Sequence, residues 1–163
     1  MSKRSVLLVD GYSLIHRGFH ALPLLSAGEV YTNGVQGFFL MLFRAISEYR
    51  PDALLVMMDV HTPTFRHSMY EEYKAGRKPT PPELRPQFDL TRQLLAAMGV
   101  TVCELAGYEA DDLLGTAARQ ANDQGWHAYV LTGDRDSLQL VGPDTQLILT
   151  KTGVSESLLL GPD

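Results

Sequence analysis

SVLLVD, residues 5–10, is a continuous apolar run that ends in an aspartate. An uninterrupted run of this length is typical of a strand buried on both faces of a parallel sheet. In open parallel sheets, ligands bind beyond the carboxyl ends of the strands, which is where Asp10 falls. The stretch therefore predicts the class of fold and the edge of the sheet at which a functional site lies.

Further strand-like runs alternate with amphipathic segments along the chain. Gly34–Tyr49 carries apolar residues at helical spacing, and glycines close two more predicted helices, Phe88–Met98 and Ala110–Asp123. Strands separated by helices pair in parallel through right-handed crossovers. The sequence thus predicts an α/β fold, a three-layer sandwich around a mostly parallel five-stranded sheet, with strands at Ser5–Val9, Ala53–Met58, Val100–Cys103, Ala128–Leu131 and Leu147–Thr150.

Composition and length indicate one soluble globular domain, residues 1–163. The chain is 45% hydrophobic, and it holds no apolar run long enough to span a membrane. The run before Asp10 is too short for a signal peptide. The single cysteine, Cys103, excludes an internal disulfide, fits a reduced cytoplasm, and lies in an apolar stretch that indicates core packing. We expect a cytoplasmic monomer that does not contact membranes.

A basic segment interrupts an otherwise acidic chain, whose net charge is −5. Residues 60–92 carry more basic than acidic side chains, and prolines punctuate residues 60–86. We predict a flexible basic arch over residues 60–86, with a short helix near Phe65–Lys74 and with Arg66, Lys78 and Arg85 as candidate DNA contacts. Aromatic residues lie among the cations of this segment, as nucleic-acid strands require. A solvated charged loop is the alternative interpretation.

Acidic residues follow four of the predicted strands. Because the carboxyl ends of parallel strands meet at one edge of the sheet, these side chains are expected to converge there. A single aspartate after a strand is usually a helix N-cap, and acids in the first turn of a helix complement its dipole. Seven like charges in one crevice, however, repel each other unless a cation neutralises them. The predicted metal ligands are Asp10, Asp59, Glu109, Asp111, Asp112, Asp134 and Asp136.

The all-oxygen character of this set favours Mg²⁺ or Mn²⁺ over zinc. The five histidines are scattered and Cys103 is alone, so no zinc-type ligand spacing is present in the sequence. Two such ions, about 3.5–4 Å apart, can hydrolyse a phosphodiester without a protein nucleophile. We identify no Ser/His/Asp or Cys/His arrangement in the chain, which agrees with metal-ion chemistry.

Four motifs carry a specific resemblance. Residues 9–13 (VDGYS) with 16–23 (HRGFHALP) resemble the opening of the 5′ nuclease domain of the bacterial DNA polymerase I type. Residues 63–67 (PTFRH) with 70–77 (YEEYKAGR) are similar to its arch-base motif, and residues 107–112 (GYEADD) and 132–140 (TGDRDSLQL) to its two acidic motifs. The motifs occur in order over about residues 5–153. The resemblance implies a PIN-like, resolvase-like fold and cleavage of DNA.

The resemblance also implies roles for individual residues. Asp10, Asp59, Glu109 and Asp111 match ligands of a first, catalytic metal, and Asp112, Asp134 and Asp136 match carboxylates of a second site. Lys74 and Arg77 match basic residues that stabilise charge developing on the scissile phosphate. Tyr73 resembles an aromatic that stacks on the terminal base, and Arg17 resembles a phosphate contact. The implied enzyme is a 5′–3′ exonuclease and flap endonuclease of replication and repair, acting on DNA with 5′ ends or flaps and on RNA primers.

One departure from the family pattern concerns length. Full-length members continue for roughly another hundred residues, which carry a helix–turn–helix element and a further aspartate pair. The present chain stops at Asp163 without them. We therefore expect a fragment with weak activity.

Two alternatives stay open at this stage. A PIN-type ribonuclease shares acidic chemistry at a sheet edge but does not need the basic arch. A non-catalytic module that binds DNA structures would keep the fold and lose turnover. A haloacid-dehalogenase-like phosphatase is disfavoured, because Asp10-Gly11-Tyr12 lacks the Asp-x-Asp pattern that such enzymes need after the first strand.

Overall fold

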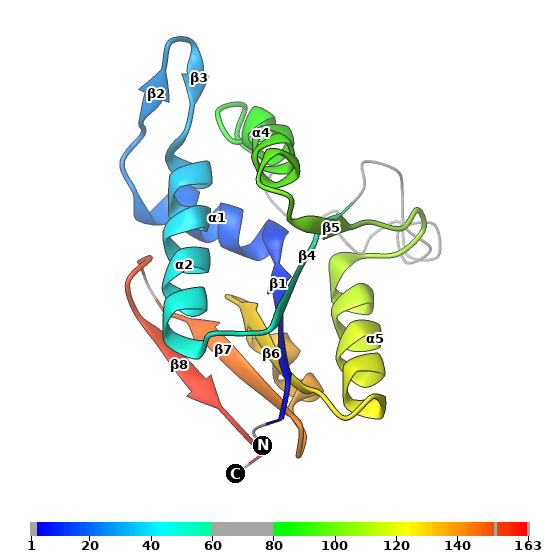
Figure 1. Ribbon diagram of the computed structural model, residues 1–163. Helices are drawn as coiled ribbons and strands as arrows, with labels where there is room; N and C mark the ends of the chain where they lie inside the picture. The colour runs from blue at the N-terminus through cyan, green and yellow to red at the C-terminus, as the bar shows by residue number, and fades with distance from the viewer. Residues whose placement is uncertain (1–2, 60–79, 152, 163) are drawn as a thin grey trace.

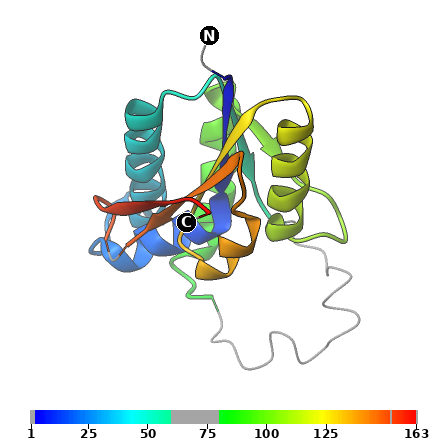
Figure 2. The same ribbon diagram turned by 90° about the horizontal axis from the view of Figure 1, so that it is seen from below.

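The computed structural model describes residues 3–59, 80–151 and 153–162. They form three layers, with a sheet between two sets of helices (Figure 1). Figure 2 shows α2 (Asn33–Tyr49) and α5 (Ala110–Asp123) on opposite sides of the strands. The predicted three-layer α/β architecture is confirmed.

The central sheet has six strands rather than the predicted five. Their order is β5-β4-β1-β6-β7-β8, and every neighbouring pair is parallel except β7 and β8. The strand missed from the sequence is β8, which is short and lies before Gly161-Pro162, a dipeptide that indicates a turn. The strands are β1 (Ser5–Asp10), β4 (Ala53–Met57), β5 (Thr101–Cys103), β6 (His127–Thr132), β7 (Thr145–Thr150) and β8 (Ser157–Leu160).

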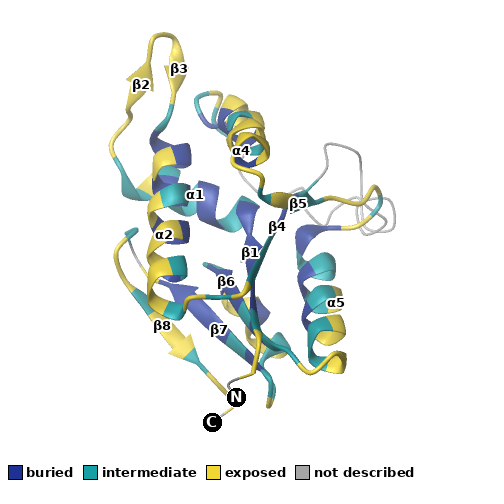
Figure 3. Cartoon of the chain, viewed as in Figure 1, coloured by how far each residue is buried: buried dark blue, intermediate teal, exposed yellow. Residues whose placement is uncertain are grey.

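Both faces of the sheet are covered, which explains the uninterrupted apolar runs. Along β1, Leu7 and Val9 pack with α1 (Gly11–Ala21), α2 and α4 (Arg85–Ala97), whereas Val6 and Leu8 pack on the side of α5. The inner strands are buried, and the outer faces of the helices are exposed (Figure 3). The core therefore consists of two apolar layers, one on each face of the sheet.

Two further features were not predicted from the sequence. Helix α1 starts directly after Asp10, and a two-stranded antiparallel hairpin, β2 (Ser26–Ala27) and β3 (Val30–Tyr31), projects from the body (Figure 1). Gly28 lies in its turn with φ of +65°, a conformation that favours glycine. The hairpin strands are two residues long, which is too short for a periodic pattern to show in the sequence.

Of the predicted helices, Ala110–Asp123 has the bounds of α5, and Gly34–Tyr49 begins one residue after α2. The prediction Phe88–Met98 starts three residues late, because α4 begins at Arg85. Pro86 was read as a loop residue, yet proline is well tolerated in the first turn of a helix. The end of the predicted arch is therefore helical, and the short helix predicted at Phe65–Lys74 lies outside the described residues.

A buried glutamine closes the amino end of α2. The N-cap residue of α2, Thr32, makes no side-chain cap hydrogen bond. Instead, Gln87 Oε1 from α4 accepts from the backbone amides of Gly34 (2.6 Å) and Val35 (3.1 Å). Gln87 Nε2 donates to Asn33 Oδ1 at 3.0 Å. This fully buried side chain thus fixes α4 against α2.

The strand order places a topological switch point between β1 and β6. From β1 the chain proceeds to β4 and β5 on one side, and it then crosses to β6 on the other side of β1. In open parallel sheets, a switch point of this kind is where ligands commonly bind. Among the described residues, no helix is long and apolar enough to cross a membrane.

Candidate metal centre

Asp10 ends β1 at the switch point and is 4% exposed. Its carboxylate caps α1, since Oδ1 accepts from the amide of Ser13 at 3.2 Å. Its other oxygen, Oδ2, accepts from the hydroxyl of Thr132 at 2.8 Å. Asp10 is therefore a helix N-cap residue, as an aspartate after a strand usually is. Its carboxylate also accepts a hydrogen bond from Thr132 and so links β1 to β6.

Asp59 follows β4 and joins that strand to the start of α5. Asp59 Oδ1 accepts from the amide of Ala110 at 2.7 Å. On the other side, the guanidinium of Arg92 donates to the backbone carbonyl of Asp59 and to Glu104 Oε1. Arg92 Nη1 also pairs with Asp89 Oδ1 at 3.1 Å. Asp59 is thus held between α4 and the start of α5.

The acidic motif before α5 supplies three carboxylates. Glu109 is the N-cap residue of α5 and is 6% exposed, and Asp111 and Asp112 occupy the first helical turn. Asp112 Oδ2 accepts from the amide of Glu109 at 3.1 Å, which is a helix-capping interaction. Asp112 therefore has a structural role in addition to any role toward a cation.

The second acidic motif follows β6. Asp134 caps the 3₁₀-helix η2 (Arg135–Leu140), because its Oδ1 accepts from the amide of Asp136 at 2.9 Å. The amide of Asp134 in turn donates to Thr132 Oγ1 at 3.1 Å. Asp136 is exposed and is not among the charges that raise the pKa of Asp10 or Asp111. Within the described residues, Asp136 thus lies at the rim of the cluster.

Burial and repulsion from neighbouring acids disfavour the ionised form of Asp10. Burial is the main cause that raises its pKa from 3.8 to about 7, and the negative charges of Asp111 and Asp59 add to the effect. The hydrogen bonds from Thr132 and Ser13 act in the opposite direction and lower the pKa. The carboxylate at the end of β1 therefore retains its proton well above the pH at which an exposed aspartate loses it.

Asp111 shows the same effect. Burial raises its pKa to about 6, and the next largest contributions are the charges of Asp134 and Asp59, followed by those of Glu109 and Asp112. Carboxylates from three strand ends therefore act on one another electrostatically. Asp111 is thus within electrostatic reach of acids that follow β4 and β6, and the assignment of the set as metal ligands stays a prediction.

The donor chemistry of this cluster fits a hard divalent cation. All of its side chains offer oxygen, and a cation would relieve the repulsion that raises the pKa values of Asp10 and Asp111. Among residues 3–59, 80–151 and 153–162, no three acidic, histidine or cysteine side chains converge closely enough to enclose an ion by themselves. Mg²⁺ usually keeps several waters and takes only one or two carboxylates directly, so a spread set suits it better than a closed cage.

Both basic residues predicted to be catalytic, and three of the five residues predicted to contact DNA, belong to a segment that is not described. Arg66, Tyr73, Lys74, Arg77 and Lys78 lie outside the described residues.

The other two predicted DNA contacts, Arg85 and Arg17, are described, and they differ in how far their side chains are buried. Arg85 is exposed in the first turn of α4. Arg17 is half-buried, and its guanidinium donates to the carbonyls of Gly133 (3.4 Å) and Lys151 (3.0 Å), which bridges the ends of β6 and β7. The predicted phosphate contact of Arg17 remains a prediction.

Sequence reasoning missed three residues that hold the acidic residues in place through their side chains or backbone: Ser13, Arg92 and Thr132. Thr132 and Arg92 act on partners that are distant in sequence, Thr132 on Asp10 across 122 positions and Arg92 on Asp59 across 33, whereas Ser13 lies only three positions from Asp10. Thr132 could have been identified from the sequence, because it is a polar residue at the end of a buried strand. Apart from its charge, nothing in the local sequence indicates that Arg92 contacts Asp59.

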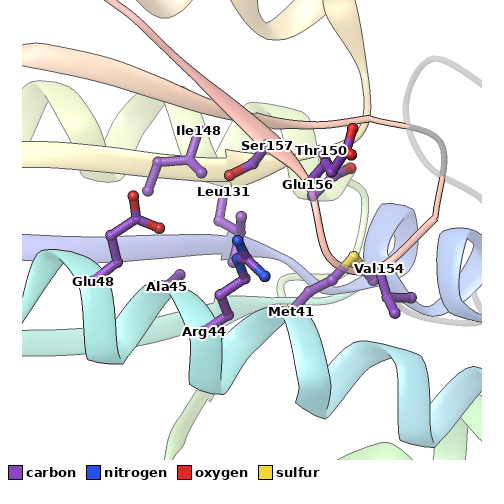
Figure 4. A pocket seen from close by; sticks show the side chains of 10 residues that line it. All are labelled: Met41, Arg44, Ala45, Glu48, Leu131, Ile148, Thr150, Val154, Glu156 and Ser157. Atoms are coloured by element: carbon purple, nitrogen blue, oxygen red, sulfur yellow. The ribbon is translucent and has the colours of Figure 1, made fainter.

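A surface hollow is lined by residues other than those of the acidic cluster. Figure 4 shows its lining side chains, which come from α2 on one side and from β6, β7 and the start of β8 on the other. None of the predicted metal ligands lines it. We therefore assign the functional site to the acidic edge of the sheet, where the pKa values of Asp10 and Asp111 are raised. The hollow is lined by Met41, Arg44, Ala45, Glu48, Leu131, Ile148, Thr150, Val154, Glu156 and Ser157.

Solved structures share this fold at low sequence identity. The D15 protein of phage T5, co-crystallised with metal ions, superposes with a TM-score of 0.72 at 17% identity, over 97% of this chain and 57% of that one. The T5 D15 flap endonuclease in a pseudo-enzyme-product complex with DNA and metal ions gives 0.71 at 18% identity, over 97% and 58%. The catalytic core of Rad2 in complex with DNA substrate gives 0.57 at 16% identity, over 98% and 48%. These likenesses establish the fold.

Sequence comparisons establish the family. The chain is 44% identical over 155 residues to DNA polymerase I of Bacillus caldotenax, covering 94% of the chain and 18% of that protein. It is 42% identical over 165 residues to DNA polymerase I of Mycobacterium bovis, covering 99% and 18%. The chain thus spans less than a fifth of the length of these relatives. The family model for the 5′-3′ exonuclease N-terminal resolvase-like domain matches residues 5–159, and the chain belongs to this family of DNA polymerase I-type 5′ nuclease domains.

Proposed function

We propose that the chain is the metal-binding part of a 5′–3′ exonuclease and flap endonuclease that hydrolyses phosphodiesters of DNA. The observation that supports this most directly is the group of acidic side chains at the switch point. Burial, with a further contribution from the charges of neighbouring acids, raises the pKa of Asp10 to about 7 and that of Asp111 to about 6. A protein without a cation to bind would gain stability by replacing them.

In this proposal Asp10, Asp59, Glu109 and Asp111 hold a first Mg²⁺ or Mn²⁺ ion, and Asp112 and Asp134, with Asp136 at the rim, hold a second. When bound, such ions activate water and neutralise the charge that builds on the phosphate. The protein contributes rigidity: Thr132 and Ser13 orient Asp10, and the amide of Ala110 orients Asp59.

The substrate side of the proposal rests on the basic segment. We propose that Lys74 and Arg77 stabilise charge on the scissile phosphate, and that Tyr73 stacks on the terminal base. Arg66, Lys78, Arg85 and Arg17 are proposed contacts to the DNA backbone. The DNA named for the solved T5 and Rad2 complexes, together with the DNA polymerase I relatives, supports DNA with 5′ ends or flaps as the substrate, and RNA primers are a further proposal.

Cleavage of a labelled 5′-flap DNA in Mg²⁺ or Mn²⁺ tests the proposal, with the chain alone and within any longer protein that carries it. Asp111→Ala should reduce cleavage by more than the roughly 10–100-fold that loss of an outer-shell partner costs, and it should leave flap binding largely intact. Lys74→Ala should slow cleavage strongly without unfolding the chain. Asp144→Ala is the matched control, because Asp144 pairs with Lys3 before β7, at the opposite edge of the sheet.

Three outcomes separate this proposal from its competitors. Equal cleavage by the Asp111→Ala variant and the wild-type chain would contradict the metal assignment. Preference for single-stranded RNA over flap DNA would instead indicate a PIN-type ribonuclease. Flap binding without turnover, together with no Mn²⁺ uptake in calorimetry, would indicate a non-catalytic module that binds DNA structures.

A further inference from the structure

The hydroxyl of Thr132 lies between two of the acidic segments. Thr132 ends β6 and is fully buried. Its Oγ1 is 2.8 Å from Asp10 Oδ2 and 3.1 Å from the amide nitrogen of Asp134. One side chain therefore contacts the carboxylate at the end of β1 and the backbone of the loop after β6, which are the two sides of the switch point.

The direction of both hydrogen bonds follows from the chemistry of the groups. A backbone amide can only donate, so Thr132 Oγ1 accepts from Asp134. The single hydroxyl proton is then available for Asp10 Oδ2, an acceptor on the ionised carboxylate. Loss of the hydroxyl would release Asp10 and the Asp134 loop together, and serine is the conservative replacement that keeps the hydroxyl.

A second link runs parallel to the first. The amide of Gly133 donates to Ser13 Oγ at 2.8 Å, while the amide of Ser13 donates to Asp10 Oδ1. The backbone of the loop approaches closely here: a Cβ on Gly133 would lie 2.9 Å from Thr150 Oγ1 and 3.0 Å from Ser13 Oγ. The loop after β6 is therefore fixed to Asp10 directly through the hydroxyl of Thr132 and indirectly through the hydroxyl and the amide of Ser13.

We propose that Thr132 is a positioning residue for the divalent-cation site, holding Asp10 and Asp134 in a fixed mutual arrangement. The inference rests on the proposed function, because it requires that these carboxylates bind a cation. Partners that orient the ligands of a metal typically change metal affinity or activity by about 10–100-fold when they are removed. Thr132 is thus assigned a role in function beyond the packing of β6.

The test is Mn²⁺ titration of the 163-residue chain by isothermal calorimetry. Thr132→Val keeps the shape of the side chain and removes the hydroxyl, and we expect Mn²⁺ affinity to fall by about 10–100-fold. Thr132→Ser keeps the hydroxyl and should retain affinity close to that of the wild type. Rescue by serine separates the hydrogen bonds from packing, because serine lacks the methyl group that valine preserves.

Thr145→Val is the matched control. Thr145 is also buried, and its hydroxyl donates to Asn122 Oδ1 at 2.8 Å, but it is the first residue of β7 and therefore lies at the opposite end of the sheet. A similar loss of thermal stability is expected in both valine variants, with loss of Mn²⁺ affinity only in Thr132→Val. Equal affinity losses in the two variants would overturn the positioning role.

Ser13→Ala gives an independent test at a half-buried position. It removes the acceptor for Gly133 and leaves Thr132 intact, and we expect a loss of Mn²⁺ affinity at the lower end of the range, about tenfold. Wild-type affinity in both Ser13→Ala and Thr132→Val would overturn the inference while leaving the proposed function standing. A wild-type chain that takes up no Mn²⁺ would overturn the proposed function, and this inference with it.

Discussion

Replacing Asp10 with asparagine should stabilise the metal-free chain at alkaline pH. Asp10 is 4% exposed, and the charges of Asp111 and Asp59 add to the burial that disfavours its ionised form. The variant Asp10→Asn removes the charge and keeps Oδ1 as the acceptor for the Ser13 amide. The cap of α1 is thus preserved, whereas the repulsion at the end of β1 is lost.

The size and sign of the effect follow from the pKa. Folding raises the pKa of Asp10 from 3.8 to about 7, and a difference of about 3 corresponds to about 4 kcal/mol. Between these two pH values the folded chain holds a proton that the unfolded chain has released, so stability falls as pH rises. Above pH 7 the penalty is complete, and below pH 3.8 it vanishes because both states are protonated. The gain from Asp10→Asn is therefore largest at pH 8, at most about 4 kcal/mol, and disappears in acid.

Urea unfolding followed by circular dichroism, with a chelator present, measures this gain. With an m-value of about 2 kcal/mol/M, a gain of 2–4 kcal/mol raises the midpoint by about 1–2 M at pH 8. Asp52→Asn is the control, since it makes the same chemical change at an exposed position at the opposite end of the sheet. Added Mn²⁺ should stabilise the wild-type chain more than the variant.

Two results would refute the reasoning about Asp10. The first is an Asp10→Asn variant that is no more stable than the wild type at pH 8. The second is a gain that stays constant from pH 8 to pH 4, since such a gain could not arise from a titrating charge.

Two further predictions concern stability and are checked by the same urea titrations. Gln87→Leu removes the acceptor of the buried amides of Gly34 and Val35, and it should lower the free energy of unfolding by about 2–4 kcal/mol. Gly133→Ala forces a Cβ to within 2.9 Å of a threonine oxygen and should lower that free energy by about 1–3 kcal/mol. Gly142→Ala is its control, because a Cβ there meets nothing within 4 Å and should change stability by less than about 0.5 kcal/mol. Equal effects of the two alanines would contradict the close packing around Gly133.

The elements that the sequence predicted well are those with a strong local pattern. The run before Asp10 and the periodic stretch of α5 were assigned because burial on both faces, or on one stripe, leaves a direct signature in the order of residues. β8 and the β2–β3 hairpin left no such signature, because they are short and largely exposed. Their pairing depends on neighbours that the local sequence does not contain.

The candidate site likewise contains some residues that the sequence predicted and others that it did not. The acids at the ends of β1, β4 and β6 were identified from sequence, since parallel strands must end at a common edge. The residues that hold them were not, because Arg92 meets the loop after β4 across 33 positions and Thr132 meets Asp10 across 122. Hydrogen bonds of that separation form only after the chain has folded.

The sequence by itself determined a parallel α/β domain with a row of carboxylates at one edge, because both follow from local hydrophobicity and from the alternation of strands and helices. The tertiary structure alone decided that β6 lies beside β1 rather than beside β5, and this order brings Asp10 to Thr132. It also decided that Asp10 is deeply buried while Asp136 is exposed. Burial and mutual repulsion set the charge state of a carboxylate, and both depend on atoms contributed by distant parts of the chain.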